Sequence, residues 1–194
     1  RQVQAVGLAS RWSWHDQAIA TAARQKLFND YDVLYPRPFD TEVHRASQRT
    51  GLPEELIYAI IRQESLFRAD AASSAGAIGL MQLLPETARL TARRAGLPEP
   101  TRAQLTKPAV NIPLGSEFLA SLVQRFEGET ALAAAGYNAG PNAARRWRPA
   151  APMDLDVWVE NIPFNETRAY VRRVAWHALV FAWLADRKPR EVSD

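Results

Sequence analysis

The chain has 194 residues, of which 47% are hydrophobic, and it carries 24 Lys and Arg against 21 Asp and Glu. This length suits one domain, or one domain with a small neighbour. The absence of cysteine excludes a disulfide scaffold, a thiolate metal site and a cysteine nucleophile. Because the cations alternate with acids, no nucleic-acid partner is expected. No stretch reaches the roughly 18–20 apolar residues that span a bilayer, so no transmembrane segment is expected either.

Residues 1–39 show a broken helical pattern of apolar residues that ends at two alternating prolines, Pro36 and Pro38. Two such prolines prevent a helix from continuing. We interpret this segment as the last helices of a preceding α-helical region, followed by an extended linker. The chain opens at Arg1 with neither Met nor a signal peptide, so we expect a processed product or a fragment of a longer protein.

From Asp40 onward the sequence predicts a mainly α-helical domain, residues 40–194. Several expected helices begin with Pro, whose missing N–H is tolerated at the first helical position. The glycines within residues 75–84 predict tight turns and a short strand or hairpin. Trp158, Trp176 and Trp183 are expected in the core, and Trp147 is the best candidate for a sugar platform. Helices are expected over residues 41–50, 53–65, 85–95, 113–126, 130–137, 141–147, 155–160 and 166–185.

The helix after Pro53 carries a carboxylate on its apolar face. Ile57, Ile60, Ile61 and Glu64 are spaced i, i+3, i+4 and i+7, so all four share one face. Burial would raise the pKa of Glu64 towards the working pH, as a glycosidase acid requires. A helix-end Glu that has already reached solvent, or one paired with a buried Arg, is the alternative interpretation.

The segment that follows does not have a simple core pattern. It contains Ser73, Gly76 and Gly79 and ends in Gln82 after an apolar pair. Small residues and glycines suit a backbone that passes close to a ligand. Ser73 and Gln82 could then offer hydrogen bonds into a cleft, whereas the alternative is an ordinary Ser/Gly turn.

Four motifs in order resemble the signature of soluble lytic transglycosylases, whose lysozyme-like fold is closest to goose-type lysozyme. The first combines Glu64-Ser65 with Ser73, nine residues later, and with the sequence Gly-Ala-Ile-Gly-Leu-Met-Gln that ends at Gln82. The resemblance covers about residues 40–185, and residues 1–39 less closely resemble the end of an α-superhelical region. The other three motifs lie within residues 111–115, 136–141 and 162–171.

This resemblance implies a mainly α, lysozyme-like domain of the α+β lysozyme superfamily, with a minor β element and a short helical segment before it. It implies that Glu64 is the single catalytic acid and base. Tyr137 would hydrogen-bond Glu64 or a sugar N-acetyl group. Two departures from many relatives, Gly136 for Ala and Leu84 for Met, leave the proton-transfer group untouched. The residues implied to line the glycan cleft are Ser73, Gln82, Tyr137, Asn138 and Glu166.

Two other carboxylates could complete a conventional glycosidase pair. Asp70 follows Glu64 by six residues, which on a continuing helix would turn it roughly 120° away, so we interpret it as a solvated turn residue. Glu166 stands at the expected start of the last helix, where the helix dipole favours a negative charge. It is therefore either a helix-start residue or, as the resemblance implies, a residue of the cleft.

The implied activity is cleavage of the β-1,4 bond between N-acetylmuramic acid and N-acetylglucosamine, which leaves 1,6-anhydromuramoyl ends. Peptidoglycan glycan strands would be the partner, other cell-wall enzymes are further candidates, and the location would be the periplasm or bacterial cell envelope. No cofactor or metal is expected, because the three His lack metal spacing and no Asp-rich calcium loop exists. A goose-type-lysozyme-like hydrolase and a non-catalytic glycan-binding module are the alternatives.

Overall fold

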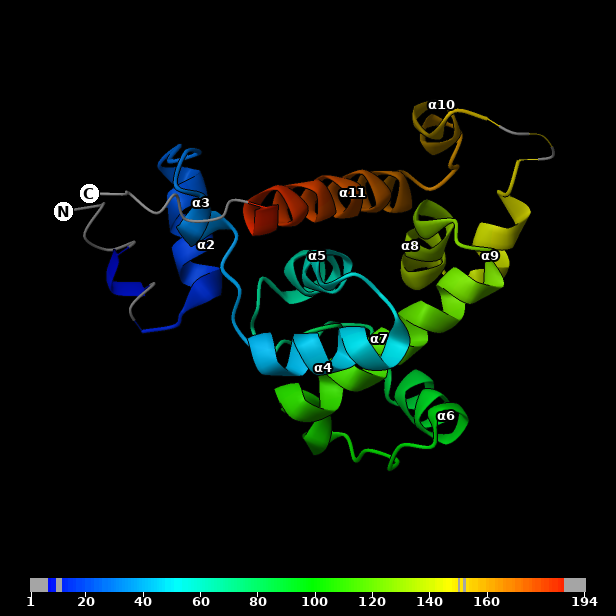
Figure 1. Ribbon diagram of the computed structural model, residues 1–194, viewed down its shortest axis with the longest axis horizontal. Helices are drawn as coiled ribbons and strands as arrows, with labels where there is room; N and C mark the ends of the chain where they lie inside the picture. Colours follow the sequence, from blue (N-terminus) through cyan, green and yellow to red (C-terminus); the bar gives the residue numbers. More distant parts are fainter. Residues whose placement is uncertain (1–6, 10–11, 150, 152, 187–194) are drawn as a thin grey trace.

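The computed structural model describes residues 7–9, 12–149, 151 and 153–186, which are mainly helical (Figure 1). The outer parts of both predicted segments, residues 1–6 and 187–194, lie outside the described residues. The helices, in chain order, are α2 (His15–Arg24), α3 (Tyr31–Leu34), α4 (Asp40–Thr50), α5 (Glu54–Ser65), α6 (Pro85–Ala95), the short 3₁₀ helix η1 (Ala103–Thr106), α7 (Pro108–Arg125), α8 (Thr130–Ala139), α9 (Pro141–Arg146), α10 (Leu155–Glu160) and α11 (Asn165–Asp186).

The centre of the fold is the pair formed by α5 and α11, which lie against each other in Figure 1. Every residue of α5 from Leu56 to Ile61 is buried, as its nearly continuous apolar sequence requires. Helices α7 and α8 pack against each other, α8 also contacts α11, and α4 packs on α7. This packing forms one main core, to which α5 contributes residues from all sides.

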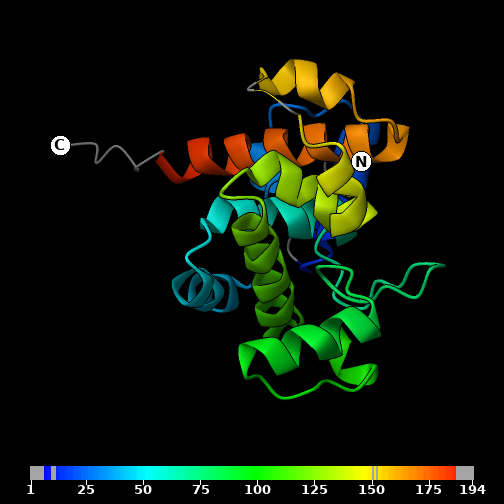
Figure 2. The ribbon, with the colours of Figure 1, turned by 90° about the vertical axis from the view of Figure 1, so that its right-hand side faces the viewer.

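A second, smaller core lies beside the main one, at the bottom of Figure 2, around α6, η1 and the start of α7. Phe118 and Tyr137 pack against both cores. The segment 78–83 also joins them, because Met81 is buried in the main core and Leu83 in the smaller one. The junction of the two cores therefore lies next to the C-terminal end of α5. The buried residues of the smaller core are Ile78, Leu83, Ala88, Ala92, Leu105 and Leu114.

Asn111 of α7 holds the segment 78–83 in place from within the protein. Its fully buried side chain accepts a hydrogen bond from the Met81 N–H at 2.7 Å and donates to the carbonyls of Ile78 and Leu105, both at 2.9 Å. Gly79 has φ +83°, and a Cβ there would lie 2.2 Å from the Leu105 carbonyl oxygen. The position therefore requires glycine for its conformation and for its space.

The minor β element that the glycines predict is confirmed as two antiparallel bridges. Ile78 pairs with Ala72 on one side and with Leu83 on the other. The segment thus folds back on itself twice, immediately after α5.

The N-terminal segment is docked on the central pair through Arg62 of α5. The Arg62 Nε donates to the Leu34 carbonyl at 2.9 Å, and its guanidinium lies 4.3 Å from the centre of the Tyr35 ring. An arginine can only donate, so the His177 Nε2 at 3.1 Å accepts, which leaves the proton on Nδ1 to be donated to the Tyr35 hydroxyl at 3.2 Å. Burial, together with the charges of Arg62 and Arg173, lowers the pKa of His177 to about 3. This link is therefore neutral at His177 and has one defined tautomer.

One predicted helix boundary is wrong. The helix expected to start at Pro113 begins five residues earlier, at Pro108, and Pro113 lies inside α7. Pro108 takes the first helical position, where its missing N–H needs no partner. Pro113 removes one interior hydrogen bond, but its neighbours Ile112 and Leu114 are buried, and their packing maintains the helix.

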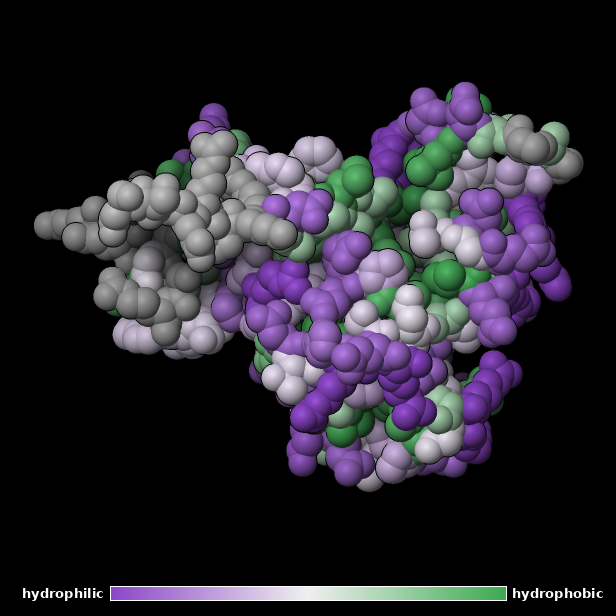
Figure 3. Space-filling model, in the orientation of Figure 1, coloured by the Kyte–Doolittle hydropathy of each residue, from purple (hydrophilic) through white to green (hydrophobic). Residues whose placement is uncertain are grey.

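The expected burial of the tryptophans is confirmed only for Trp158, which is buried. Trp176 and Trp183 on α11 are 60% and 45% exposed, so their assignment to the core is wrong. Figure 3 shows apolar residues gathered along α11 and next to α10, whereas the face over α4 is mainly hydrophilic. Despite these apolar surfaces, none of the helices in the described part of the chain combines the length and hydropathy needed to cross a membrane.

Candidate active site

The site begins where α5 ends, at Glu64 and Ser65. The next two residues, Leu66 and Phe67, both have positive φ, 50° and 68°. Non-glycine residues adopt this left-handed conformation only when their surroundings impose it, and two in succession turn the chain sharply. Phe67 is buried, which anchors the turn. The turn leaves Glu64 at the end of the helix, facing the folded-back segment that follows.

Glu64 is half-buried, and the Tyr170 hydroxyl donates a hydrogen bond to its Oε1 at 2.7 Å. The pKa of Glu64 is raised to about 7, mainly by burial and to a smaller degree by the negative charge of Glu166, while the Tyr170 hydrogen bond acts in the opposite direction. The carboxyl is therefore close to half protonated at neutral pH. A group in this condition can donate a proton and take it back, which is what a general acid and base requires.

A cavity of about 440 Å³ brings Glu64 together with Ser73 and Gln82, two of the residues predicted to line a cleft. The Ser73 hydroxyl accepts a hydrogen bond from the Ala77 N–H at 3.0 Å. The Gln82 amide donates to the carbonyls of Ala71 and Gly79, at 3.1 and 2.9 Å. Gln82 also has φ +47°. Its side chain and backbone are thus fixed at the edge of the cavity by the segment that Asn111 holds.

Tyr137 and Glu166 are close enough to Glu64 to interact with it electrostatically, and Asn138 is linked to Glu166. The Asn138 amide donates to Glu166 at 3.5 Å, and its carbonyl oxygen accepts from Thr167 at 2.7 Å. Burial raises the pKa of Tyr137, and the charge of Glu64 raises it further. The structure thus brings Ser73, Gln82, Tyr137 and Glu166 near Glu64 at the end of α5, and it links Asn138 to this group through Glu166.

The hydrogen bond to Glu64 comes from a residue that the sequence interpretation did not select. Tyr137 donates instead to the Met81 carbonyl at 2.8 Å. The hydroxyl that donates to the Glu64 carboxylate is that of Tyr170 on α11. The sequence spacing could have indicated Tyr170, because it follows Glu166 by four residues and therefore shares its helix face. Asp70 is 82% exposed and lies 3.6 Å from Arg68, which confirms its interpretation as a solvated turn residue.

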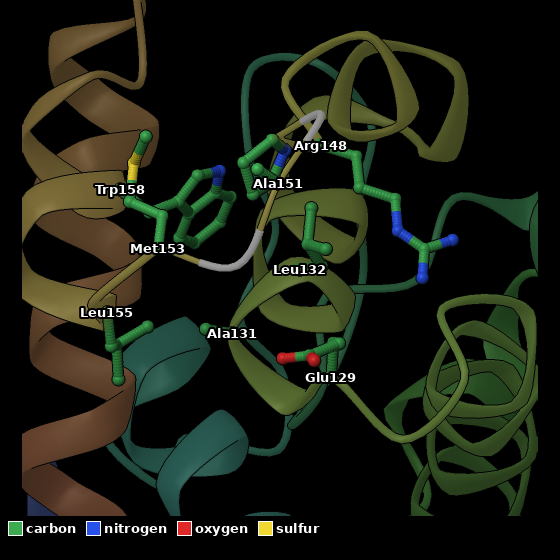
Figure 4. A pocket seen from close by; sticks show the side chains of 9 residues that line it. Glu129, Ala131, Leu132, Arg148, Ala151, Met153, Leu155 and Trp158 are labelled. Carbon is green, nitrogen blue, oxygen red and sulfur yellow. The ribbon is translucent and has the colours of Figure 1, made fainter.

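Another cavity, of about 530 Å³, lies between α8, the segment before α10 and α10 itself (Figure 4). Its lining is mainly apolar, and Arg148 at its rim is paired with Glu127. None of the six predicted site residues lines it, so the candidate active site is the Glu64 cavity and not this one. Within the described residues, no group of three or more His, Asp or Glu side chains is placed to hold a metal ion.

Replacing Tyr170 by Phe should move the pH dependence of the site. The hydrogen bond from Tyr170 stabilises the ionised form of Glu64, so its removal should raise the pKa of Glu64 further. The alkaline limb of kcat/KM should therefore shift to higher pH, by about one pH unit. Tyr137→Phe is the matched control, because that hydroxyl bonds the Met81 carbonyl and not Glu64. An unchanged limb in Tyr170→Phe would contradict the assigned hydrogen bond.

Replacing Glu166 by Gln should shift the pKa of Glu64 in the opposite direction. Its negative charge disfavours the ionised form of Glu64, so Glu166→Gln should lower the pKa of Glu64 and move the alkaline limb down by about half a pH unit. The same variant should weaken turnover or glycan binding, while the fold persists. Glu160→Gln, at an exposed position of α10 where Glu160 pairs with Arg172, is the control that should leave the limb in place. A shift to higher pH in Glu166→Gln would show that Glu166 does not act on Glu64 through its charge.

Comparison with known proteins gives consistent results. Residues 42–154 match the family model described as Transglycosylase SLT domain. The putative soluble lytic murein transglycosylase of Haemophilus influenzae is 34% identical over 95% of this chain and 31% of its own length. The soluble lytic murein transglycosylase of Escherichia coli K12 is 31% identical over 99% of this chain and 30% of its own length.

A solved structure is equally similar. An inactive Glu-to-Gln mutant of lytic transglycosylase Slt from Pseudomonas aeruginosa superposes with a TM-score of 0.90 and 38% identity, over 97% of this chain and 31% of that one. The chain thus spans about 30% of the length of the curated relatives that it matches.

Proposed function

The chain belongs to the transglycosylase SLT domain family, and from this membership we propose that it is a peptidoglycan lytic transglycosylase in which Glu64 is the only catalytic acid and base. Its fold is the mainly α, lysozyme-like fold that the motifs predicted. The observation that carries the proposal is the state of Glu64. It is a half-buried carboxyl with a pKa of about 7, in a cavity with amide and hydroxyl groups and with Asp70 turned to solvent.

The first step is protonation of the leaving group. Protonated Glu64 donates its proton to the glycosidic oxygen between N-acetylmuramic acid and N-acetylglucosamine, and the bond from that oxygen to C1 breaks. The positive charge that develops at C1 is stabilised by the carbonyl oxygen of the neighbouring N-acetyl group. The Tyr170 hydrogen bond then stabilises the Glu64 carboxylate that remains.

The second step uses the substrate's own nucleophile. The C6 hydroxyl of the muramic acid attacks C1, and its proton returns to Glu64, so the enzyme regains its starting state. No second carboxylate is needed, unlike in conventional glycosidases. The intramolecular hydroxyl has a large effective concentration, which favours ring closure over attack by water. The product ends in 1,6-anhydromuramic acid.

The other predicted residues have supporting roles in this proposal. Ser73, Gln82, Tyr137 and Asn138 bind or shape the sites for sugar amides and hydroxyls around Glu64, and Glu166 tunes its pKa. Residues 40–194 form the catalytic domain, and residues 1–39 are the end of a preceding α-helical region. Peptidoglycan as substrate places the activity in the bacterial cell envelope, on the periplasmic side of the inner membrane.

Mass spectrometry of the products released from purified peptidoglycan tests the proposal. A lytic transglycosylase releases muropeptides with anhydro ends, which weigh one water less than the corresponding reducing ends. Reducing ends would show a goose-type-lysozyme-like hydrolase on the same fold. Binding to glycan strands with no product of either kind would leave a glycan-binding module and overturn the enzymatic assignment.

A further inference from the structure

A buried hydroxyl in the first turn of α11 connects two parts of the candidate site. Thr167 is only 2% exposed, and its hydroxyl lies 2.7 Å from the carbonyl oxygen of the Asn138 side chain. We propose that Thr167 is a positioning residue, which holds the Asn138 amide in one orientation and thereby fixes a hydrogen-bond donor for the glycan. The inference rests on the proposed function, because it assigns part of the glycan binding to a residue that the proposed mechanism does not use.

The two partners of the Asn138 side chain define its orientation. An amide oxygen only accepts hydrogen bonds, and an amide NH2 group donates them. The Thr167 hydroxyl therefore donates to the oxygen, and the NH2 group donates to the Glu166 carboxylate at 3.5 Å. The reversed amide would place its oxygen against that carboxylate, which has no proton to offer. Glu166 thus selects the orientation, and the shorter bond from Thr167 holds it.

Thr167 can hold the amide because its own position is fixed. Tyr170, Val171 and Val174 follow it on the inner side of α11 and are buried in the main core. The branched Cβ of threonine also restricts its side chain to few rotamers in a helix. The bond to Asn138 therefore runs from a rigid first turn of α11 to the last turn of α8.

Two hydroxyls of α11 serve different groups of the site. Thr167 bonds the Asn138 amide, and Tyr170, three residues later and close to the same helix face, bonds the Glu64 carboxyl. Tyr170 therefore acts on the group that is proposed to move the proton. The amide that Thr167 holds takes no part in proton transfer. Substitutions at these two positions should consequently change different kinetic parameters.

The Asn138 amide has a donor to spare for a ligand. A primary amide carries two N–H groups, and Glu166 accepts a hydrogen bond from one of them. In the part of the chain that the structure describes, the other meets no protein acceptor, and Asn138 is only half-buried. The hydroxyl and N-acetyl oxygens of a glycan are acceptors of the required kind. A donor that is already held in place loses little freedom when such a ligand binds, which favours affinity.

Two substitutions at position 167 separate the hydroxyl from the shape of the side chain. Thr167→Val removes the hydroxyl and should raise KM for glycan strands about three- to tenfold, as the loss of a neutral hydrogen bond predicts. Its kcat should stay within about twofold, because the donor binds the ground state and the transition state alike. Thr167→Ser keeps the hydroxyl and should return KM to within about twofold of the parent.

The pH dependence distinguishes this role from a packing defect. The alkaline limb of kcat/KM should stay in place in Thr167→Val, because Tyr170 and the charge of Glu166 are unchanged. A defect in packing would instead reach Tyr170, one turn away, and so disturb the acid Glu64. A lower kcat with a displaced limb, or an unchanged KM, would overturn the positioning role.

A double variant tests whether Thr167 acts through Asn138. In the Asn138→Ala background there is no amide to hold, so adding Thr167→Val should change KM by less than about twofold. Effects of the two substitutions that simply multiply would show independent roles and overturn the inference.

The mobility of the Asn138 amide tests the inference without any measurement of activity. Nitrogen-15 relaxation of side-chain NH2 groups should show a rigid Asn138 in the parent and in Thr167→Ser. In Thr167→Val the group should become as mobile as that of Asn29, which is exposed and serves as the reference. This result would support the inference even if the products carried reducing ends, which would overturn the proposed function alone. An Asn138 amide that stays rigid in Thr167→Val would overturn the inference whatever the products are.

Discussion

Glu64→Gln is expected to lower turnover by at least 10²- to 10⁴-fold, because it removes the only group proposed to donate and recover the proton. Release of anhydro products from peptidoglycan over time measures this loss. Asp70→Asn is the matched control, since it neutralises an exposed carboxylate six residues away and should leave turnover within a few-fold. Equal damage by the two substitutions would favour a hydrolase with two carboxylates.

The same variant should fold at least as well as the parent at neutral pH. In the unfolded chain Glu64 ionises near the ordinary glutamate value of about 4.3, whereas in the fold its pKa is about 7. Below about pH 4.3 Glu64 is protonated in both the folded and the unfolded state, so its ionisation costs the fold no stability. Between about pH 4.3 and 7 the carboxyl is ionised in the unfolded chain but still protonated in the fold, and this difference favours unfolding. The fold therefore loses roughly 3 kcal/mol as pH rises through this range, a penalty that Gln does not carry.

Melting temperatures of Glu64→Gln and the parent at pH 4 and pH 8 check this linkage. The two proteins should agree at pH 4, and the variant should melt at the same or a higher temperature at pH 8. A variant that melts clearly lower at pH 8 would mean that Glu64 is ionised and favourably paired in the fold. The assignment of Glu64 as the general acid would then have to be abandoned.

Asn111→Ala should cause the largest loss of stability, about 3–5 kcal/mol in the free energy of unfolding. The substitution leaves the Met81 N–H and the carbonyls of Ile78 and Leu105 buried without their side-chain partner. It also frees the segment that positions Gln82, so activity should fall in the protein that remains folded. Urea unfolding at constant pH measures the effect.

Asn142→Ala is the control for this substitution. Asn142 is exposed, and its side chain accepts a hydrogen bond from Arg125 at 3.3 Å, so the change should stay within about 0.5 kcal/mol. A similarly small effect of Asn111→Ala would mean that water or a shifted backbone satisfies the segment without Asn111.

Helix α5, which carries Glu64, could be predicted from the sequence because the pattern that specifies it is local. The spacing of Ile57, Ile60, Ile61 and Glu64 follows the helical period, and the three isoleucines are fully buried in the structure. The starts of most helices were predictable for the same reason. The exception is α7, where two prolines offered alternative first residues. Pro108 and Pro113 are both acceptable at a first helical position, and only the packing of α7 decides between them.

Features that depend on contacts between distant elements were not predictable from local patterns. Helix α11 carries two apolar stripes with the same period, and one of them, which includes Val174, His177 and Phe181, is buried against α5. The other, with Trp176 and Trp183, faces solvent. The helical period of the apolar residues does not determine which of the two stripes packs against the core. The Tyr170 hydrogen bond is similar, because it joins residues 106 positions apart.

The docking of the N-terminal segment through Arg62 and His177 has a consequence for where the molecule can be divided. The family match covers residues 42–154, but one continuous core runs from Ala9 to Phe181, and the hydroxyl that bonds the Glu64 carboxyl comes from α11. A chain cut at the limits of the family match would expose the inner side of α5 and lose Tyr170. The unit that folds around this core is thus larger than the segment that the family model matches, and it includes helices on both sides of that segment.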